Sequence, residues 1–409
     1  MTAIALLNPE SSPHVVADSL LSASGRDPRQ SKIVWLPALG SIRSEWGSDD
    51  EPWHITRLGR KSFFLPNSSG VLVFAGDCRT AFNFWAELSD AIANVALYDS
   101  SVRVRRALVD RVLAHTVGAA DIALLGVLID ENGRREAYVH NAMRLDTVNF
   151  GSCYVAGTGA PLVAHLIRST DIRISNDGGW PATIRISATE NLAEQISSDM
   201  LYEESLVGNG LTKTTPIGAQ CGGFYEWYGI ETLGIRPMRP RIDLHLKIED
   251  HRVFATRVHL SEMFELIEPP RSTLPSQRYS LTVLNLGLDP YELTPDVDKC
   301  VGWKITPDEV HGVIIEPTFR LYEQSEDGSG TSRLWGPLSS EVLMDLFSAP
   351  IDVHRVRMTV RKAGSAKAKG MYTNVGELSN ARLSFVDGQL CLQLSSKLKQ
   401  TALAIAARL

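Results

Sequence analysis

The sequence predicts an α+β protein with more than one domain. At 409 residues the chain is about 2.7 times the length of a typical ~150-residue domain. Its first half alternates pairs of strand patterns with pairs of helical patterns, which is not the regular alternation of a βαβ chain. Beyond residue 240 strand patterns dominate. Apolar residues make up 44% and charged residues 22%, so the composition excludes disorder, collagen and coiled coil as the main state.

The first elements are short strands. Residues 2–7 (TAIALL) and 14–18 (HVVAD) flank a turn-forming segment rich in Pro, Asn and Ser, which predicts a hairpin. A long connection over about 20–58 follows, and it contains a strand-like run at 33–36. Connections of this length are usually functional or carry their own structure. Residues 61–65 and 71–75 then form a second predicted strand pair.

Helical spacing follows these strands. It begins at about Arg79, returns over 102–115, and is interrupted by predicted strands at 122–129 and 137–140. Two more helices are expected, one after Gly159-Ala160-Pro161 and one over 188–206, beginning after Ser187.

The prolines and glycine of residues 234–240 mark the best domain boundary. We therefore expect one domain over 1–234 and a β-rich accessory domain over 240–409. The second domain should hold a hairpin at Asp387-Gly388 and a terminal helix over 396–409. Its other expected strands lie at 242–248, 252–260, 279–286, 310–322 and 353–360.

Charge and cysteine content restrict the partners. Acidic residues number 47 and basic residues 41, so the net charge of −6 predicts no nucleic-acid partner. The clean apolar run at 122–129 is far shorter than the ~20 residues of a membrane span, and the start lacks a basic leader, which predicts a cytoplasmic protein without a membrane partner. The five scattered cysteines favour reduced thiols, and we expect no cofactor and no metal. The histidines His245, His251 and His259 are interpreted as exposed or satisfied side chains.

Thr2 is a candidate nucleophile. A threonine hydroxyl needs a base, and removal of Met1 would give Thr2 one on the same residue, its own α-amine. A free α-amine titrates near ~8, so it can accept a proton at neutral pH. Many chains begin Met-Thr without catalytic purpose, and further residues must support this interpretation.

Three sequence blocks provide that support. Asp18 follows Thr2 by 16 positions; Phe74-Ala75-Gly76 precedes a helix that carries Phe84-Trp85; and Gly157-Thr158-Gly159-Ala160-Pro161 follows later. In spacing and order these blocks resemble the proteasome β-subunit family, most closely the bacterial HslV peptidases, which also start Met-Thr. The resemblance covers residues 2–167 and extends towards 230, while 240–409 has no counterpart.

The resemblance implies a four-layer αββα sandwich, the fold of N-terminal-nucleophile (Ntn) hydrolases, and a threonine-type hydrolase that cleaves amide bonds through an acyl-enzyme. Thr2 would attack the carbonyl, Lys61 would supply positive charge beside it, and Asp18 would orient the lysine. The backbone N–H of Gly76 would stabilise the oxyanion, and Thr158 would hydrogen-bond near the nucleophile.

Several alternatives remain open. Because of the insertion at about 20–58, a competing register places Lys32 rather than Lys61 at the catalytic position; Lys61 is preferred, because its spacing to Gly76 needs no gap. Leu20 stands where the family usually has arginine or glutamine, and Asp199 and Ser205 are weak candidates for groups that support the amine. A peptide or protein is the leading substrate class. A non-peptide amidase, or an inactive assembly protein that binds through its β-rich domain, are the alternatives. We expect a homo-oligomer, and an ATP-dependent unfoldase is a candidate partner.

Overall fold

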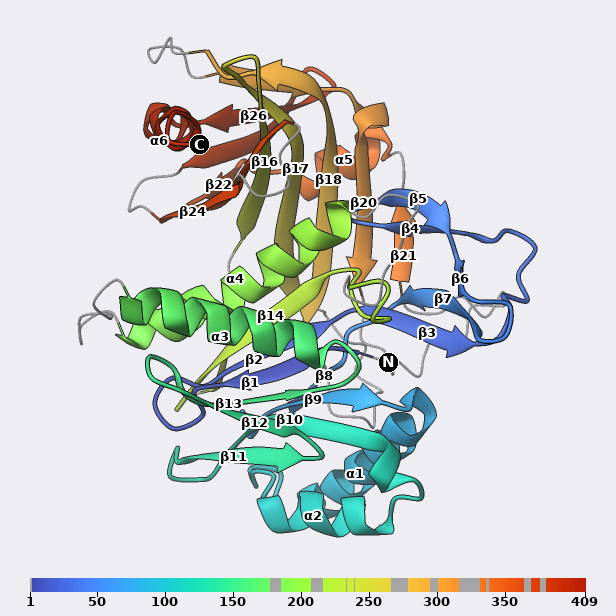
Figure 1. The fold of residues 1–409 in the computed structure, drawn as a ribbon. Coiled ribbons are helices and arrows are strands. Elements are labelled where there is room, and N and C mark those ends of the chain that lie inside the picture. The colour runs from blue at the N-terminus through green and yellow to red at the C-terminus, as the bar shows by residue number, and fades with distance from the viewer. Residues whose placement is uncertain are drawn as a thin grey trace. The chain divides into compact units, whose positions relative to one another are not determined.

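The computed structural model describes residues 2–176, 185–206, 216–232, 234–238, 240–265, 279–294, 301–315, 332–335, 338–363, 369–375 and 380–409. It is a mixed α/β structure with mainly antiparallel sheets, as the composition of strand and helix patterns predicts (Figure 1). The chain divides into two compact units. Unit 1 comprises Met1–Met238, Glu265–Ser280 and Ile315–Ser332, and unit 2 comprises Arg239–Phe264, Leu281–Ile314 and Arg333–Leu409. No helix in these ranges is both long and apolar enough to cross a bilayer.

A six-stranded antiparallel sheet organises unit 1, in the order β12-β13-β1-β2-β14-β15. The predicted N-terminal hairpin forms its centre, with Ile4 opposite Ala17. Asn8 adopts φ 45° in the turn of this hairpin, a conformation that asparagine tolerates. The strands are β1 (Ile4–Leu7), β2 (His14–Asp18), β12 (Met143–Thr147), β13 (Gly151–Ala156), β14 (Tyr225–Glu231) and β15 (Gly234–Pro237).

The second sheet of unit 1 has four strands in the order β11-β10-β9-β8. Its strand β10 is the apolar run seen in the sequence and is buried along its whole length, because it lies between two strands and two packed layers. The strands are β8 (Ser62–Leu65), β9 (Gly70–Gly76), β10 (Ile122–Ile129) and β11 (Arg135–His140).

Helices cover both sheets. Helices α1 (Cys78–Ala96) and α2 (Arg106–His115) share an apolar cluster with the four-stranded sheet, in which the Phe63 ring stacks on Trp85 with centroids 4.4 Å apart. Helices α3 (Ala160–Asn176) and α4 (Arg185–Leu206) contact the six-stranded sheet, and β1 and β2 contact β9 and β10. Figure 1 shows the resulting order from α3 and α4 through both sheets to α1 and α2.

Helix α4 begins earlier than the sequence suggests. The expected start lies after Ser187, but the helix already includes Arg185. Residues 185–187 contain no proline or glycine that would stop the helix, so its backbone continues one turn further towards the N-terminus. Ser187 is therefore a residue of the first turn and not the cap.

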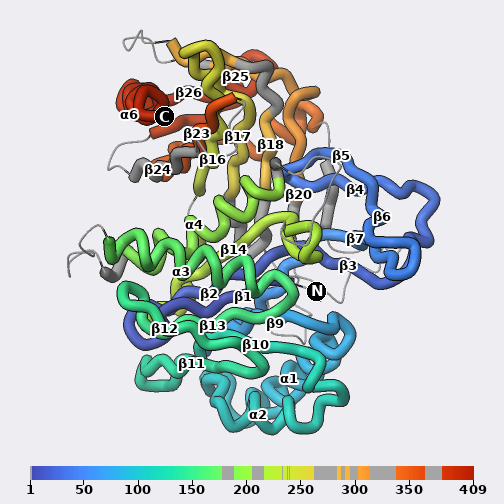
Figure 2. The backbone as a smooth tube through the Cα atoms, viewed as in Figure 1, coloured from blue at the N-terminus to red at the C-terminus, as the bar shows by residue number. Residues whose placement is uncertain are grey.

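The segment between β2 and β8 carries its own structure. Strands β3 (Leu20–Ser24), β7 (Pro52–Leu58) and β6 (Glu45–Gly47) form a small sheet, and β4 (Ile33–Leu36) pairs with β5 (Gly40–Arg43). Figure 2 shows this insertion as a blue excursion from the strands of unit 1. Its ends lie together, because the Gly59 N–H donates to the Ser19 carbonyl at 2.8 Å.

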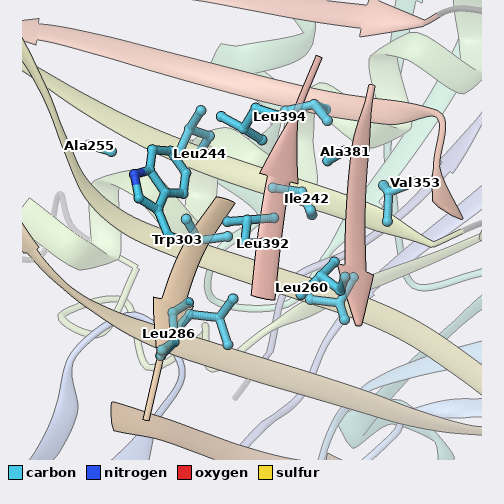
Figure 3. Packing of buried hydrophobic residues seen from close by; sticks show 14 of the residues in the cluster. Ile242, Leu244, Ala255, Leu260, Leu286, Trp303, Val353, Ala381, Leu392 and Leu394 are labelled. Carbon is cyan, nitrogen blue, oxygen red and sulfur yellow. The ribbon is translucent and has the colours of Figure 1, made fainter. Parts of the chain in front are cut away.

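Unit 2 is built from a seven-stranded sheet and a four-stranded sheet around one apolar core (Figure 3). Alternate residues of β16, such as Ile242 and Leu244, enter this core together with Trp303 and Leu392. The sequence places the hairpin between β25 (Ala381–Val386) and β26 (Gln389–Leu394) correctly, and both turn residues, Asp387 and Gly388, have positive φ.

The elements of unit 2 are β16 (Arg241–Glu249), β17 (Arg252–Glu265), β18 (Tyr279–Glu292), β19 (Val301–Ile305), β20 (Val310–Ile315), β21 (Ser332–Trp335), α5 (Ser340–Leu346), β22 (Ile351–Val353), β23 (Arg355–Lys362), β24 (Lys369–Val375), β25 (Ala381–Val386), β26 (Gln389–Leu394) and α6 (Ser396–Ala406). The expected strand at 310–322 is observed as far as Ile315, and residues 316–322 lie outside the described ranges.

His14 makes the stability of unit 1 sensitive to acid. The ring is buried against Trp227, and burial lowers the pKa of His14 to about 4 even though Glu190 favours the charged form. The unfolded chain takes up a proton near pH 6.5, so the contribution of neutral His14 is complete above that pH and is lost as the pH falls towards 4. Urea unfolding at pH 7, 5.5 and 4.5 provides the measurement. As the pH falls over this range, the free energy of unfolding of the wild type should decrease by up to about 3 kcal/mol more than that of His14→Asn.

His115 is the matched control for this comparison, because its ring nitrogen also meets a backbone carbonyl but lies in an exposed position. His115→Asn should follow the wild-type pH profile. Equal acid sensitivity in the wild type and His14→Asn would contradict the prediction.

Candidate active site

A buried lysine joins the first residues of the chain to the end of β2. Lys61 Nζ donates to Thr2 Oγ1 at 2.9 Å, to Asp18 Oδ1 at 2.7 Å and to the Leu20 carbonyl at 2.6 Å. The side chains of Lys61 and Asp18 are 0% exposed. An ammonium has three protons, and all three have an acceptor here. The structure thus brings three of the residues expected from the sequence, Thr2, Asp18 and Lys61, into one hydrogen-bonded group.

The N-terminal hairpin explains the position of Asp18. The Asp18 N–H donates to the Ala3 carbonyl at 3.1 Å, which places the last residue of β2 directly beside the start of β1. Its carboxylate is held on both oxygens, since Oδ1 also accepts from the Ala3 N–H and Oδ2 accepts from the Gly222 N–H, each at 2.9 Å. These bonds fix the orientation of the carboxylate towards Lys61. Thr2 and Asp18, 16 positions apart in the sequence, therefore lie close together because the chain reverses between them.

The two lysines that the sequence left as alternatives lie in different environments. The Lys61 carbonyl accepts from the Phe74 N–H at 3.1 Å, so the pairing of β8 with β9 continues back to Lys61 without a gap. Lys32 lies in the insertion, where its Nζ pairs with Glu45 at 2.9 Å and its side chain is 51% exposed. The lysine beside Thr2 is Lys61.

The loop after β13 holds the backbone of Thr2. The Thr2 N–H donates to Thr158 Oγ1 at 3.2 Å, and the Gly159 N–H donates to the Thr2 carbonyl at 3.0 Å. Gly157 adopts φ +90°, and a Cβ there would lie 2.1 Å from the Thr2 carbonyl oxygen. Any side chain at 157 would push the loop off Thr2. The side chain of Thr158, expected from the sequence, thus contacts the backbone nitrogen of Thr2.

Gly76 ends β9 with φ +102°, and a Cβ at this position would lie 2.2 Å from the Asp121 carbonyl oxygen. Only glycine fits here. The preceding Ala75 reaches the loop that holds Thr2, because its Cβ is 3.2 Å from where a Gly157 Cβ would be. Directly after Gly76, Asp77 caps α1 by accepting from the Thr80 N–H at 2.7 Å. This cap fixes the end of β9 and with it the position of Gly76.

Two features near Asp18 escaped the sequence interpretation. One is the Gly222-Gly223 turn, whose first N–H binds Asp18, and the other is Glu204 of α4, whose Oε2 accepts from the Gly223 N–H at 2.9 Å. The pair of glycines was the only sequence signal available for the turn. Of the weak candidates, Asp199 accepts from Gln195 Nε2 at 3.4 Å within α4, and the side chain of Ser205 lies outside the described residues.

A thiol also lies close to the hydrogen-bonded group of Thr2, Asp18 and Lys61. Cys78 is the first residue of α1 and is half-buried. Burial raises its pKa, and the positive charges of Arg57 and Lys61 oppose this shift only in part. A raised pKa keeps the thiol protonated at neutral pH, and a protonated thiol is a poor nucleophile. The hydroxyl of Thr2 is therefore the better candidate in this region.

Within the described ranges, no group of three or more His, Cys, Asp or Glu side chains is arranged to hold a metal ion. His245 and His259 contact each other edge to face, with ring centroids 5.3 Å apart, while His251 occupies the turn between β16 and β17 with φ 61°.

No family model matches the chain, and no curated protein matches it either.

The buried ion pair should dominate the stability of this region. Removing one partner leaves an unpaired charge in the interior, which typically costs about 3–5 kcal/mol. We expect Asp18→Asn and Lys61→Met each to lower the free energy of unfolding by that amount, and the double variant to lose less than the sum. Urea unfolding of the four proteins provides the measurement.

Lys32→Met is the control, because it removes a lysine–carboxylate pair that is half exposed. Its effect on the free energy of unfolding should be small. Additive losses in the double variant would show that Asp18 and Lys61 do not stabilise one another.

Proposed function

We propose that unit 1 is an N-terminal-nucleophile hydrolase that cleaves amide bonds through an acyl-enzyme on Thr2 after Met1 is removed. The observation that carries this proposal is the hydrogen bond from buried Lys61 Nζ to Thr2 Oγ1, with Asp18 on the same ammonium. A cation beside a hydroxyl stabilises the alkoxide that forms when the proton leaves.

The stacking of sheets and helices in unit 1 supports the four-layer αββα sandwich that the family resemblance implies. In this proposal, residues 1–234 form the hydrolase domain and residues 240–409 are an accessory domain. We retain peptides or proteins as the expected substrates and self-association as the expected state. Non-peptide amides would suit the same nucleophile, since the chemistry depends on the carbonyl and not on the rest of the substrate.

The chemistry proceeds in two steps. The α-amine of Thr2, released by loss of Met1, accepts the proton of Oγ1 while Oγ1 attacks the carbonyl carbon. The Gly76 N–H would stabilise the oxyanion of the tetrahedral intermediate. The C–N bond then breaks, and the protonated amine gives its proton to the leaving nitrogen. Water hydrolyses the remaining ester and regenerates the Thr2 hydroxyl.

The hydrogen bonds favour the amine as the base. Lys61 donates its protons to Asp18, Leu20 and Thr2, so in this arrangement its nitrogen is a donor to the hydroxyl and not an acceptor from it. The hydroxyl proton must go elsewhere, and the amine of the same residue is the nearest base that Met1 removal creates. Thr158 Oγ1, 3.2 Å from the Thr2 nitrogen, would orient that amine.

Intact-mass measurement on the native protein tests the first requirement. The mass should correspond to residues 2–409, because a Thr2 nitrogen still bound to Met1 is an amide and cannot act as a base. A native protein that retains Met1 would contradict the proposal.

Covalent labelling tests the nucleophile. An electrophile that reacts with both a hydroxyl and an adjacent amine should label the wild type once, and Thr2→Ala should abolish labelling without loss of folding or association. Thr2→Ser is the matched control, since it keeps both groups and should still be labelled. Unchanged labelling of Thr2→Ala would reject Thr2 as the nucleophile.

A further inference from the structure

A buried carboxyl group from α4 binds the turn that holds Asp18. Glu204 is 0% exposed, and its Oε2 accepts from the Gly223 N–H at 2.9 Å. The neighbouring Gly222 N–H donates to Asp18 Oδ2 at the same distance. Two consecutive backbone N–H groups therefore point to two different carboxyl groups, one in the ion pair and one in the helix.

The turn between these carboxyl groups also positions the chain around Lys61. The Gly222 carbonyl accepts from the N–H groups of Ser19 and Leu20, at 3.2 and 3.0 Å. The Leu20 carbonyl in turn accepts from Lys61 Nζ. Two of the three acceptors of the lysine, the Asp18 carboxylate and the Leu20 carbonyl, are thus linked to Gly222. A shift of this turn would move both of them.

Glu204 fits closely against the turn. Gly222 and Gly223 adopt φ +132° and +80°, and a Cβ on Gly222 would lie 2.2 Å from Glu204 Oε2. A Cβ on Gly223 would lie 2.4 Å from Leu58 Cδ2. The backbone of the turn is therefore packed between the insertion and the Glu204 carboxyl, with no room for side chains.

The surroundings of Glu204 favour its neutral form. Burial raises the pKa of Glu204 to about 8; the Gly223 N–H opposes this shift, and the negative charge of Asp18 adds to it. Among the residues that the structure describes, Cys221 and Tyr225, of the segment that continues into β14, also interact with this carboxyl, and neither supplies a positive charge. Glu204 Oε1 has no hydrogen-bond partner among the described residues. An ionised carboxylate would gain one N–H and no cation.

We propose that Glu204 is a positioning residue, whose neutral carboxyl holds the Gly222-Gly223 turn and through it the Asp18–Lys61 pair. When Glu204 loses its proton in mildly alkaline solution, a second negative charge forms near Asp18. The Gly222-Gly223 turn then shifts so that water can reach the Glu204 carboxylate. The link from Glu204 to Asp18 is structural, and its effect on turnover rests on the proposed function.

One amide reports on this turn. Cys221-Gly222 is the single Cys-Gly pair in the sequence, so a protein with carbonyl-¹³C cysteine and ¹⁵N glycine gives one carbonyl-coupled amide signal, that of Gly222. We expect this signal to shift with a midpoint near pH 8 in the wild type. A Gly222 signal that does not change near this pH overturns the inference without the need for a variant.

Glu204→Gln separates this titration from that of the Thr2 amine, which is expected in the same range. Glutamine keeps an oxygen for the Gly223 N–H and cannot ionise, so the shift near pH 8 should disappear. Glu203→Gln, an exposed neighbour in α4, should leave it unchanged. A titration that persists in Glu204→Gln belongs to another group and overturns the inference.

The labelling rate of Thr2 measures the consequence for the site. Above the Glu204 titration and up to pH 9.5, the wild-type rate should fall by about tenfold for each pH unit relative to the rate of Glu204→Gln. The rate of Glu204→Gln should not fall over this range, because the only remaining titration frees the Thr2 amine to act as the base. An equal fall of the labelling rate at alkaline pH in the wild type and in Glu204→Gln would show that Glu204 does not control the site. A wild type with the Gly222 titration but no labelling would reject the proposed function and leave the positioning role of Glu204 supported.

Discussion

The ammonium of Lys61 is the constraint on which the structure around Thr2 depends. Placing a charge in the interior costs several kcal/mol unless a counter-ion and further acceptors replace water. Here those acceptors are Thr2 Oγ1, Asp18 Oδ1 and the Leu20 carbonyl, from three points along the chain. The N-terminal hairpin, the entry to the insertion and the strand pair β8–β9 must all be in place before the lysine is satisfied.

The rest of the site is rigid for related reasons. The Thr158 hydroxyl accepts from the Thr2 N–H, and the Gly159 N–H donates to the Thr2 carbonyl. Glycine is required at Gly157, where a Cβ would meet the Thr2 carbonyl, and at Gly76, where a Cβ would meet the Asp121 carbonyl. Asp18 accepts from two N–H groups in addition to the lysine, so its carboxylate has little freedom to rotate. Under the proposed function, groups held in this way would need little reorganisation when charge develops, which is a general requirement for efficient catalysis.

Local patterns in the sequence explain why much of this could be predicted. The hairpin that joins Thr2 to Asp18 depends on a short turn, and the distance from Lys61 to Gly76 depends on one gapless strand pair; both are short-range properties. The same gapless spacing favours Lys61 over Lys32, but spacing alone leaves Lys32 open, because the environment of Lys32 depends on its pairing with Glu45 across the insertion. Glu204 was missed, since its hydrogen bond with the Gly223 N–H forms only when α4 meets a turn 19 residues further on.

The closed base of the insertion has a consequence for the architecture of the chain. Ser19 and Gly59 are hydrogen-bonded to each other, and Leu20 lies opposite Leu58, so the segment leaves and returns at one point directly beside Asp18 and Lys61. The tip at residues 47–51 is exposed. Length added at this tip does not alter the separation of the two catalytic candidates at the base. Evolution or design can therefore insert a recognition element at this tip while the Asp18–Lys61 pair at the base keeps its position.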